Sequence, residues 1–189
     1  MKIGLYFGSF NPVHNGHLII ANFIAYNTDL DMVWLVVSPQ NPLKPAGSLL
    51  NEHHRFHLVE LAVKGAARLR ASNIEFSLPR PSFTIDTLTY LAEKFPTHEF
   101  SVIMGSDSLE NLPRWKNYEQ LIRDYPLYIY MRPGHPAREL PGARITVLEA
   151  PMLDISSTAI RKWIKEGKPV RYLIPDEIVA YIDENNYYR

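Results

Sequence analysis

The chain has 189 residues, of which 46% are hydrophobic and 12% aromatic, a composition that suits one compact domain and excludes a disordered or fibrous protein. Twenty basic and twenty acidic side chains give a formal net charge of zero, so no overall positive field attracts nucleic acid. Cysteine is absent, which excludes disulfides and thiolate metal sites.

The chain carries no recognisable targeting or membrane signal. The apolar run at 1–8 is too short and too interrupted by glycine for a signal peptide, and no later segment approaches the length of a membrane span. We therefore expect a cytoplasmic protein that binds neither membrane nor nucleic acid. The sequence leaves the oligomeric state open, and a homo-oligomer is compatible with it.

Apolar runs alternate with helical patterns along the chain. Residues 3–7 predict a strand buried on both faces, 17–26 a helix and 32–37 a second buried strand. The elements predicted after these are a helix at 52–66, a strand at 74–78, a helix at 84–94, a strand at 100–104, a helix at 118–123, and strands at 127–131 and 144–148.

Two helices are predicted to close the chain, one at 157–166, ended by Gly167, and one opening at Pro175. The alternation of strands and helices predicts an α/β fold, a doubly wound and mainly parallel sheet with C-terminal helices, in a single domain. Ligands of such sheets bind beyond the carboxyl ends of the strands, so the turn-rich segments 39–50 and 79–82 are candidate substrate loops.

The stretch GSFNPVHNGH, residues 8–17, joins the first strand to the first helix. Gly8 and Ser9 follow the strand directly, so backbone N–H groups and the positive end of the helix dipole are expected to favour an anion there, such as a phosphate. His14 and His17 can flank the same spot, each with an N–H donor. The alternative is a capped turn with two exposed histidines.

A second polar stretch, ISSTAIR at 155–161, opens the first C-terminal helix. Its hydroxyls and free N–H groups gather at a helix N-terminus, and Arg161 lies one turn further in as a candidate partner of a polyphosphate. The alternative is an ordinary N-cap followed by a surface arginine.

Together the two stretches resemble the signature motifs of the nucleotidylyltransferase superfamily, G-[TS]-F-D-P-x-H-x-G-H and ISSTxxR. The resemblance implies a Rossmann-like fold, a single nucleotidylyltransferase domain over 1–189 and an ATP phosphate site completed by the helical part at 153–189. The implied ATP-binding residues are Gly8, Ser9, Phe10, His14, His17, Gly105, Asp107, Ser156, Ser157, Thr158 and Arg161. Those implied to act in catalysis are His14, His17, Lys44 and Arg161.

Further segments resemble the bacterial nicotinate-nucleotide adenylyltransferases over the whole chain. Residues 81–88 resemble their S-Y-T-x-D-T-L segment, and 105–116 resemble G-x-D-x-[LS] followed by L-x-x-W-[KR]. The resemblance implies that Gly105 and Asp107 contact the adenosine side of the substrates. The residues implied to bind the second substrate are Thr84 and Trp115, beside the nicotinate ring, and Lys44 and Arg132, at phosphate or base.

The sequence departs from the family pattern at three positions: Asn11 replaces the usual Asp, Phe83 a common Tyr, and Phe7 a frequent Gly. A separate cluster, His53, His54 and His57, has metal-like spacing. It lacks the Glu of a zinc-protease helix, so a solvated helix face is expected and no protein metal site is predicted.

The function expected from this resemblance is transfer of the adenylyl group of ATP to nicotinate mononucleotide, giving nicotinate adenine dinucleotide and pyrophosphate in NAD biosynthesis. Mg²⁺ is expected on the ATP phosphates. Two alternatives stay open: another acceptor, either nicotinamide mononucleotide or phosphopantetheine, and a non-catalytic nucleotide sensor, which could discard His14 and His17.

Overall fold

The structure, a computed structural model, describes residues 1–40, 49–137 and 139–189. Six strands form one sheet in the order β3-β2-β1-β4-β5-β6, and every neighbouring pair is parallel. The strands are β1 Lys2–Gly8, β2 Met32–Val37, β3 Leu69–Ser72, β4 Glu99–Gly105, β5 Leu127–Tyr130 and β6 Ile145–Leu148. The prediction of a doubly wound parallel sheet in an α/β fold is confirmed.

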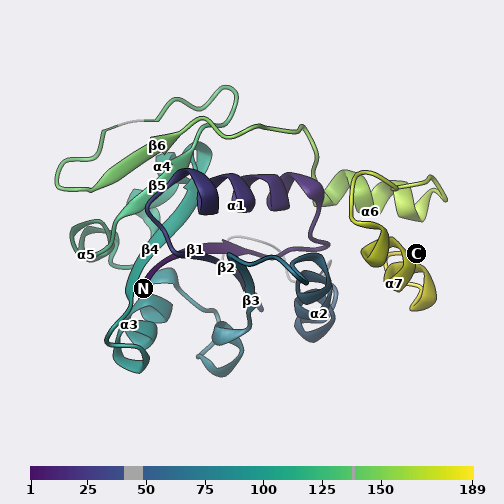
Figure 1. Cartoon of the computed structure of the whole chain (residues 1–189), viewed down its shortest axis with the longest axis horizontal. Coiled ribbons are helices and arrows are strands. Elements are labelled where there is room, and N and C mark those ends of the chain that lie inside the picture. Colours follow the sequence, from purple (N-terminus) through teal and green to yellow (C-terminus); the bar gives the residue numbers. More distant parts are fainter. Residues whose placement is uncertain (41–48, 138) are drawn as a thin grey trace.

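Seven α-helices lie in the described ranges: α1 Asn15–Asn27, α2 Glu52–Ala62, α3 Thr84–Lys94, α4 Ser106–Asn111, α5 Tyr118–Asp124, α6 Ser157–Lys165 and α7 Asp176–Glu184. Two 3₁₀ turns, η2 Ile74–Ser77 and η3 Leu112–Arg114, accompany them. Figure 1 shows α1 and α3 on opposite sides of the sheet, and α6 and α7 together at the end beyond α2. None of the helices in the described ranges is long and apolar enough to cross a bilayer.

Strand side chains alternate between two hydrophobic cores, one on each face of the sheet. Leu5 of β1 packs in the core that α3 and α5 cover, whereas the next residue, Tyr6, packs in the core shared with α1, α6 and α7. The same alternation holds in β4, where Val102 and Ile103 belong to different cores. Burial on both faces explains why the strands read as continuous apolar runs.

One predicted strand is wrong. The strand predicted at 74–78 is replaced by η2, Ile74–Ser77, and the strand at this place in the chain is β3, Leu69–Ser72. The alternation Ile74, Glu75, Phe76 imitates a strand, but Glu75 is buried through hydrogen bonds rather than exposed. β3 is an edge strand of four residues that pairs only with β2, too short to carry a recognisable pattern.

Smaller differences concern the ends of helices. α1 begins at Asn15 rather than 17, α2 ends at Ala62 rather than 66, and the six-residue α4 was not predicted. Helix ends are set by capping contacts made in three dimensions, which periodicity does not contain.

The strand order reverses between β1 and β4, which lie side by side in the centre of the sheet. β1 ends at Gly8 and β4 at Gly105. In open parallel sheets the crevice beyond the carboxyl ends at such a reversal is the usual ligand site. The fold therefore brings the loops that follow β1 and β4 to that crevice.

Candidate active site

The turn after β1 is built on a buried aromatic ring. Phe10 has a left-handed backbone, with φ of 44°, and only 2% of its side chain is exposed. Its ring meets those of Tyr6 and His17 edge to face, and a Cβ added to Gly8 would lie 2.8 Å from it. Only glycine therefore fits at position 8, and the Phe10 side chain supports the turn from the core side.

His14 and His17 cap the start of α1 reciprocally. The His17 backbone N–H donates to Nδ1 of His14 at 3.4 Å, and the His14 backbone N–H donates to Nδ1 of His17 at 3.2 Å. The two rings stack with centroids 3.7 Å apart. Because each Nδ1 accepts a hydrogen bond, each neutral ring carries its proton on Nε2, which is thereby a donor.

The environment of His14 keeps its ring neutral. Burial, together with the positive charge of Arg132, lowers the pKa of His14 from 6.5 to about 4. Only 6% of the residue is exposed. The expected alternative of a capped turn with two exposed histidines is therefore right about the cap and wrong about the exposure of His14.

The start of α6 docks against the same turn. Ser157 Oγ donates to the Pro12 carbonyl at 2.9 Å, and Arg161 Nη1 donates to the Asn11 carbonyl at 2.8 Å. Ser156 is the N-cap of α6 and accepts from the backbone N–H of Ala159. The two stretches, which lie more than a hundred residues apart in the sequence, thus meet through side chain to backbone bonds.

Thr158 also lies at this junction, since Arg161 Nη2 is 3.4 Å from its Oγ1. The structure therefore brings together the whole predicted ISSTxxR set and the predicted histidines. The structure also shows a role for α6 that the sequence did not predict. Ser157 and Arg161 each use one hydrogen-bond donor to hold the 8–17 turn in place.

A cavity of about 490 Å³ opens where β1 and β4 end. Predicted residues of the ATP side and of the acceptor side share its lining: Gly8, Ser9, Gly105 and Asp107 on the first, Thr84, Trp115 and Arg132 on the second. The lining also includes residues that were not predicted, among them Ser38, Gln40, Glu75, Ser82, Arg114 and Lys116. Of these, Gln40 and Ser82 lie in the segments that the turn-rich composition singled out.

Two polar atoms of the cavity lining are buried without a hydrogen-bond partner among the described residues, Ser9 Oγ and Asp107 Oδ1. Unsatisfied buried polar atoms are rare in folded proteins, so both are suited to contact a ligand. Asp107 Oδ2 faces Arg132 Nη1 at 3.8 Å, and a Cβ on Gly105 would lie 2.9 Å from Cδ of Arg132. The small size of Gly105 thus allows the arginine to lie over the strand end.

The opposite wall is formed by the start of α3 and the loop after η3. Phe83 is the N-cap residue of α3 and Thr84 its first residue, while Trp115 follows η3. Lys116 lies over the Phe83 ring, with Nζ 5.1 Å from its centroid, and pairs with Asp86 at 2.8 Å. This wall combines aromatic surface with two basic side chains, Arg114 and the Asp86-paired Lys116, which suits a heteroaromatic ring that carries an anionic group.

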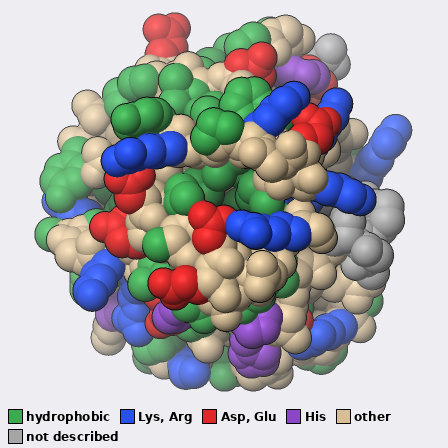
Figure 2. Space-filling model, turned by 90° about the vertical axis from the view of Figure 1, so that its right-hand side faces the viewer, with side chains coloured by type: hydrophobic (Ala, Val, Ile, Leu, Met, Phe, Trp, Pro, Cys, Tyr) green, Lys and Arg blue, Asp and Glu red, His purple; other side chains and the backbone are tan. Residues whose placement is uncertain are grey.

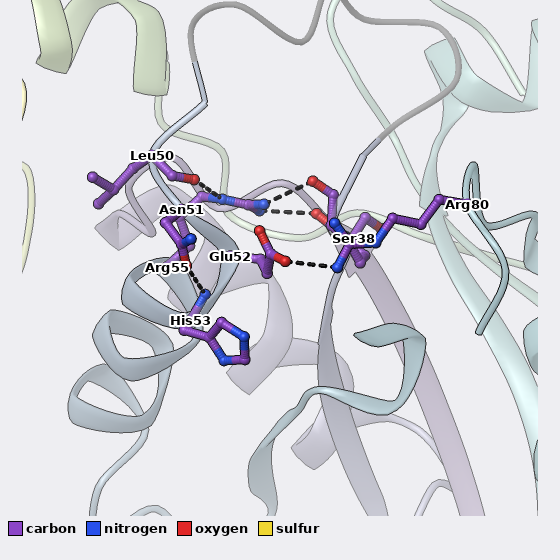
Figure 3. A network of polar contacts seen from close by, with 8 residues as sticks. Ser38, Leu50, Asn51, Glu52, His53, Arg55 and Arg80 are labelled. Atoms are coloured by element: carbon purple, nitrogen blue, oxygen red, sulfur yellow. Dashed lines mark hydrogen bonds and ion pairs between the residues drawn. The ribbon is translucent and has the colours of Figure 1, made fainter. Parts of the chain in front are cut away.

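A buried arginine ties the ATP-side turn to the neighbouring strand. Arg55 of α2 is 0% exposed, and its guanidinium donates to the backbone carbonyls of Ser9, Ser38, Pro39 and Leu50 (Figure 3). Burial lowers the pKa of Arg55. Four carbonyl oxygens satisfy a charge that would otherwise be costly to bury. The end of β2, the start of α2 and the turn after β1 are thereby fixed to one another.

The three-histidine cluster does not converge on one point. His57 Nδ1 lies 3.7 Å from Glu60, His54 Nδ1 bonds the Tyr187 hydroxyl at 2.8 Å, and the His53 ring meets Phe76 edge to face. Among the described residues no three His, Cys, Asp or Glu side chains gather as a metal-ligand set.

Comparisons with known proteins place this site in a family. A model of cytidylyltransferase-like proteins matches residues 5–163. The "Probable nicotinate-nucleotide adenylyltransferase" of Flavobacterium psychrophilum is 48% identical over the full length of both chains. The protein of the same name from Cytophaga hutchinsonii is 51% identical over all of this chain and 98% of its own. This chain belongs to the nicotinate-nucleotide adenylyltransferase family.

The fold of the family is also seen in a solved structure. The nicotinic acid mononucleotide adenylyltransferase of Plasmodium falciparum, complexed with NaAD, superposes with a TM-score of 0.83 over 99% of this chain and 97% of its own. The two sequences are only 22% identical, so this match bears on the fold. It supports the Rossmann-like assignment of the doubly wound sheet.

The structure shows the contacts of two residues that depart from the family pattern. Asn11 Oδ1 accepts from the Leu50 backbone N–H at 3.2 Å and from the Tyr188 hydroxyl at 2.9 Å. The side chain at position 11 thus joins the turn to α2 and to the C-terminal residues, a use of Oδ1 that Asp and Asn share. Phe83 keeps the aromatic face beneath Lys116. The predicted Lys44 lies outside the described residues.

Proposed function

We propose that the chain transfers the adenylyl group of ATP to nicotinate mononucleotide, forming nicotinate adenine dinucleotide and pyrophosphate. Membership of the family supports the reaction. The observation that carries it in the structure is the meeting of the histidine turn and the ISSTxxR helix beside a cavity whose other wall is aromatic and positively charged.

The chemistry asks for positioning and charge stabilisation rather than a covalent enzyme intermediate. A phosphate oxygen of the acceptor attacks the α-phosphorus of ATP, a new P–O bond forms, and the bond to the departing pyrophosphate breaks. Holding both anions in line, with donors aimed at the developing charge, lowers the barrier.

We assign the donors as follows. Nε2–H of His14 and of His17 face the phosphates, in the protonation state that the capping bonds impose. Ser9 and the start of α1 favour the same anion, and the remaining guanidinium N–H groups of Arg161 bind the polyphosphate. Lys44 is assigned by resemblance to a phosphate.

Asp107 and Gly105 are assigned to the adenosine side, where Asp107 Oδ1 is buried without a partner among the described residues. Arg132 beside them is assigned to a phosphate or base contact. Thr84 and Trp115 form the wall assigned to the nicotinate ring.

We propose Mg²⁺ as the cofactor, bound through the ATP phosphates. Mg²⁺ keeps several waters and can be held by substrate phosphate oxygens, so it needs no cage of protein carboxylates, and the described residues form no such group. When bound there, it neutralises charge on the leaving pyrophosphate.

The proposal is tested by measuring pyrophosphate release from Mg²⁺-ATP with nicotinate mononucleotide, nicotinamide mononucleotide or phosphopantetheine as separate acceptors. A reaction without acceptor controls for ATP hydrolysis. We expect the fastest release with nicotinate mononucleotide. Release with another acceptor alone would reassign the substrate, and tight ATP binding without release in any reaction would favour a non-catalytic sensor.

A further inference from the structure

A buried carboxyl group lies among the lining residues of the cavity, next to the acceptor wall. Glu75, in η2, is 2% exposed, and its two carboxylate oxygens accept separate hydrogen bonds, one from Ser82 Oγ and one from Thr87 Oγ1, both at 2.8 Å. The side chain of Ser38, at the end of β2, is a third hydrogen-bonding group at this carboxyl. No step of the proposed reaction uses Glu75.

The two hydroxyls that bind Glu75 bracket the acceptor wall. Ser82 precedes Phe83 and Thr84, and Thr87 follows them one turn into α3. The stretch between the two bonds is therefore the N-terminal turn of α3, whose N-cap side chain makes no capping bond of its own. Because each oxygen of the Glu75 carboxylate bonds one hydroxyl, Ser82 or Thr87, Glu75 can hold that turn in place.

Burying a carboxyl group costs desolvation free energy that packing contacts alone do not offset. Desolvation raises the pKa of Glu75, against the opposing effect of the three hydroxyls. An apolar residue would fill the same space without that cost. The geometry that its two hydrogen bonds impose on the wall gives the carboxyl a role that an apolar residue could not fill.

We propose that Glu75 is a positioning residue for the acceptor: through Ser82 and Thr87 it sets the place of Phe83 and Thr84, and hence the fit of the pyridine nucleotide. Phe83 and Thr84 line the cavity, whereas Thr87 is fully buried behind it. The inference rests on the proposed function. It predicts a changed KM for nicotinate mononucleotide and an unchanged KM for ATP.

The decisive variant is Thr87→Val, which removes one hydroxyl with little change in shape at a residue outside the cavity lining. We expect the KM for nicotinate mononucleotide to rise about tenfold, the scale of a lost hydrogen bond to a charged group, while the KM for ATP changes less than about twofold. Thr87→Ser restores the hydroxyl and is expected to restore the KM. The matched control is Thr89→Val, which removes a bond to the Ile85 carbonyl on the same helix.

The Glu75→Gln variant distinguishes a positioning role of Glu75 from repulsion of the acceptor by its negative charge. If the negative charge of Glu75 merely repelled the anionic acceptor, its neutralisation would lower the KM for nicotinate mononucleotide; loss of positioning raises it. We expect the rise. We also expect the double variant Glu75→Gln/Thr87→Val to be affected less than the sum of the two single variants, because both substitutions act on the same group of hydrogen bonds.

Two results would overturn the inference: equal changes in both KM values, or wild-type KM values in folded Thr87→Val and Glu75→Gln. Thermal unfolding establishes which variants are folded, and Ser82→Ala makes the same comparison if Thr87→Val does not fold. A wild-type protein that releases no pyrophosphate would instead refute the proposed function, so the two failures are distinguishable.

Discussion

His14 and His17 each do two things with one ring. Nδ1 of each satisfies a backbone N–H at the start of α1, and this bond leaves Nε2 as the donor. The spacing of three residues is that of a capping box, in which N-cap and N3 side chains bond reciprocally. The sequence allowed two interpretations of these histidines, as donors to a phosphate or as caps of the turn. The structure makes the two compatible, because Nδ1 caps the helix while Nε2 stays a donor.

The double role of His17 makes a paired substitution informative. In His17→Asn, Oδ1 can still accept from the His14 backbone N–H, but the donor at Nε2 is gone. We expect kcat to fall by about 10² to 10³, the usual effect of removing one preorganised donor, with little change in the KM for ATP. His17→Ala should show the same loss of kcat and an additional loss of stability of about 1 kcal/mol.

Steady-state kinetics and urea unfolding measure the two effects separately. A His17→Asn variant that keeps kcat within about threefold of wild type would remove His17 from the catalytic assignment. Stability lost equally in both variants would show that Asn does not replace the cap.

His14 makes folding stability depend on pH. Its pKa is about 4 in the folded protein, against the ordinary histidine value of 6.5 in the unfolded chain, so the unfolded chain takes up the proton first as pH falls. Its contribution is therefore fully present above pH 6.5 and is lost as pH falls toward 4. The linkage relation gives a loss of about 2 kcal/mol between pH 7.5 and pH 5.

Urea unfolding at both pH values checks this prediction, with His14→Asn as the control that keeps a capping acceptor but does not titrate. We expect the free energy of unfolding to fall more steeply in the wild type than in His14→Asn, by about that amount. Parallel pH profiles would mean that His14 ionises normally in the folded protein.

At the scale of elements, α6 acts as a clamp on the turn after β1. Arg161 donates to the Asn11 carbonyl with one nitrogen, which leaves other N–H groups for the polyphosphate. A lysine has one nitrogen and cannot hold both partners in this fork geometry. The position therefore requires the guanidinium and not only a positive charge.

We expect Arg161→Lys and Arg161→Ala both to raise the KM for ATP, the second by about 10-fold or more, because charge-assisted bonds contribute about 1.5 to 3 kcal/mol each. Ser157→Ala should act in the same direction and less strongly, since it frees the Pro12 carbonyl without removing a charge. Arg171→Ala, at an exposed arginine that pairs with Asp176, is the matched control. Wild-type KM values for ATP in both Arg161 variants would contradict the clamp.

The elements also show how far sequence reasoning reaches. Five of the six strands and most helices follow from apolar runs and helical periodicity, and in β1, β2, β4 and β5 burial on both faces leaves a continuous hydrophobic pattern. The segment at 74–78 was misassigned because Glu75 is polar and yet buried, held by Ser82 and Thr87 from a later part of the chain. Periodicity assumes that polar residues are exposed, and fails where a tertiary hydrogen bond overrides that assumption.

The site residues likewise fall into those that the sequence predicted and those that it did not. The predicted glycines line the cavity, and the predicted α6 residues dock on the turn that the histidines cap, but within the described part of the chain neither the histidines nor the α6 residues are among the lining residues. Arg55 and Glu75 were missed, because each is identified only by the partners it finds in three dimensions. The cytoplasmic location, the Mg²⁺ requirement and the role of Lys44 stay predictions from the sequence.

At the scale of the whole molecule, charge is distributed without a dominant sign. Figure 2 shows the end that carries α6 and α7, where basic and acidic side chains are interspersed and hydrophobic side chains gather toward the upper part. A net charge of zero gives no general field that draws anions to the protein. Recognition of two anionic substrates therefore has to come from the local donors of the cavity.

The cavity joins two subsites that are anchored to different parts of the fold, the ATP side to the ends of β1 and β4, and the acceptor side to α3 and the loop after η3. This separation predicts that Trp115→Ala raises the KM for nicotinate mononucleotide by about tenfold, the value of one aromatic stacking contact, while the KM for ATP changes by less than about twofold. Trp115→Phe should retain much of the binding because a smaller ring still stacks.

The complementary variant is Asp107→Asn on the ATP side, which keeps the shape of the side chain and removes its charge. We expect the KM for ATP to rise and that for nicotinate mononucleotide to stay near the wild-type value, the reverse of the Trp115→Ala result. Initial rates over a grid of both substrate concentrations give the two KM values from one experiment. If either variant changed both KM values equally, the two walls would not be independent, and the division of the cavity into an ATP side and an acceptor side would be wrong.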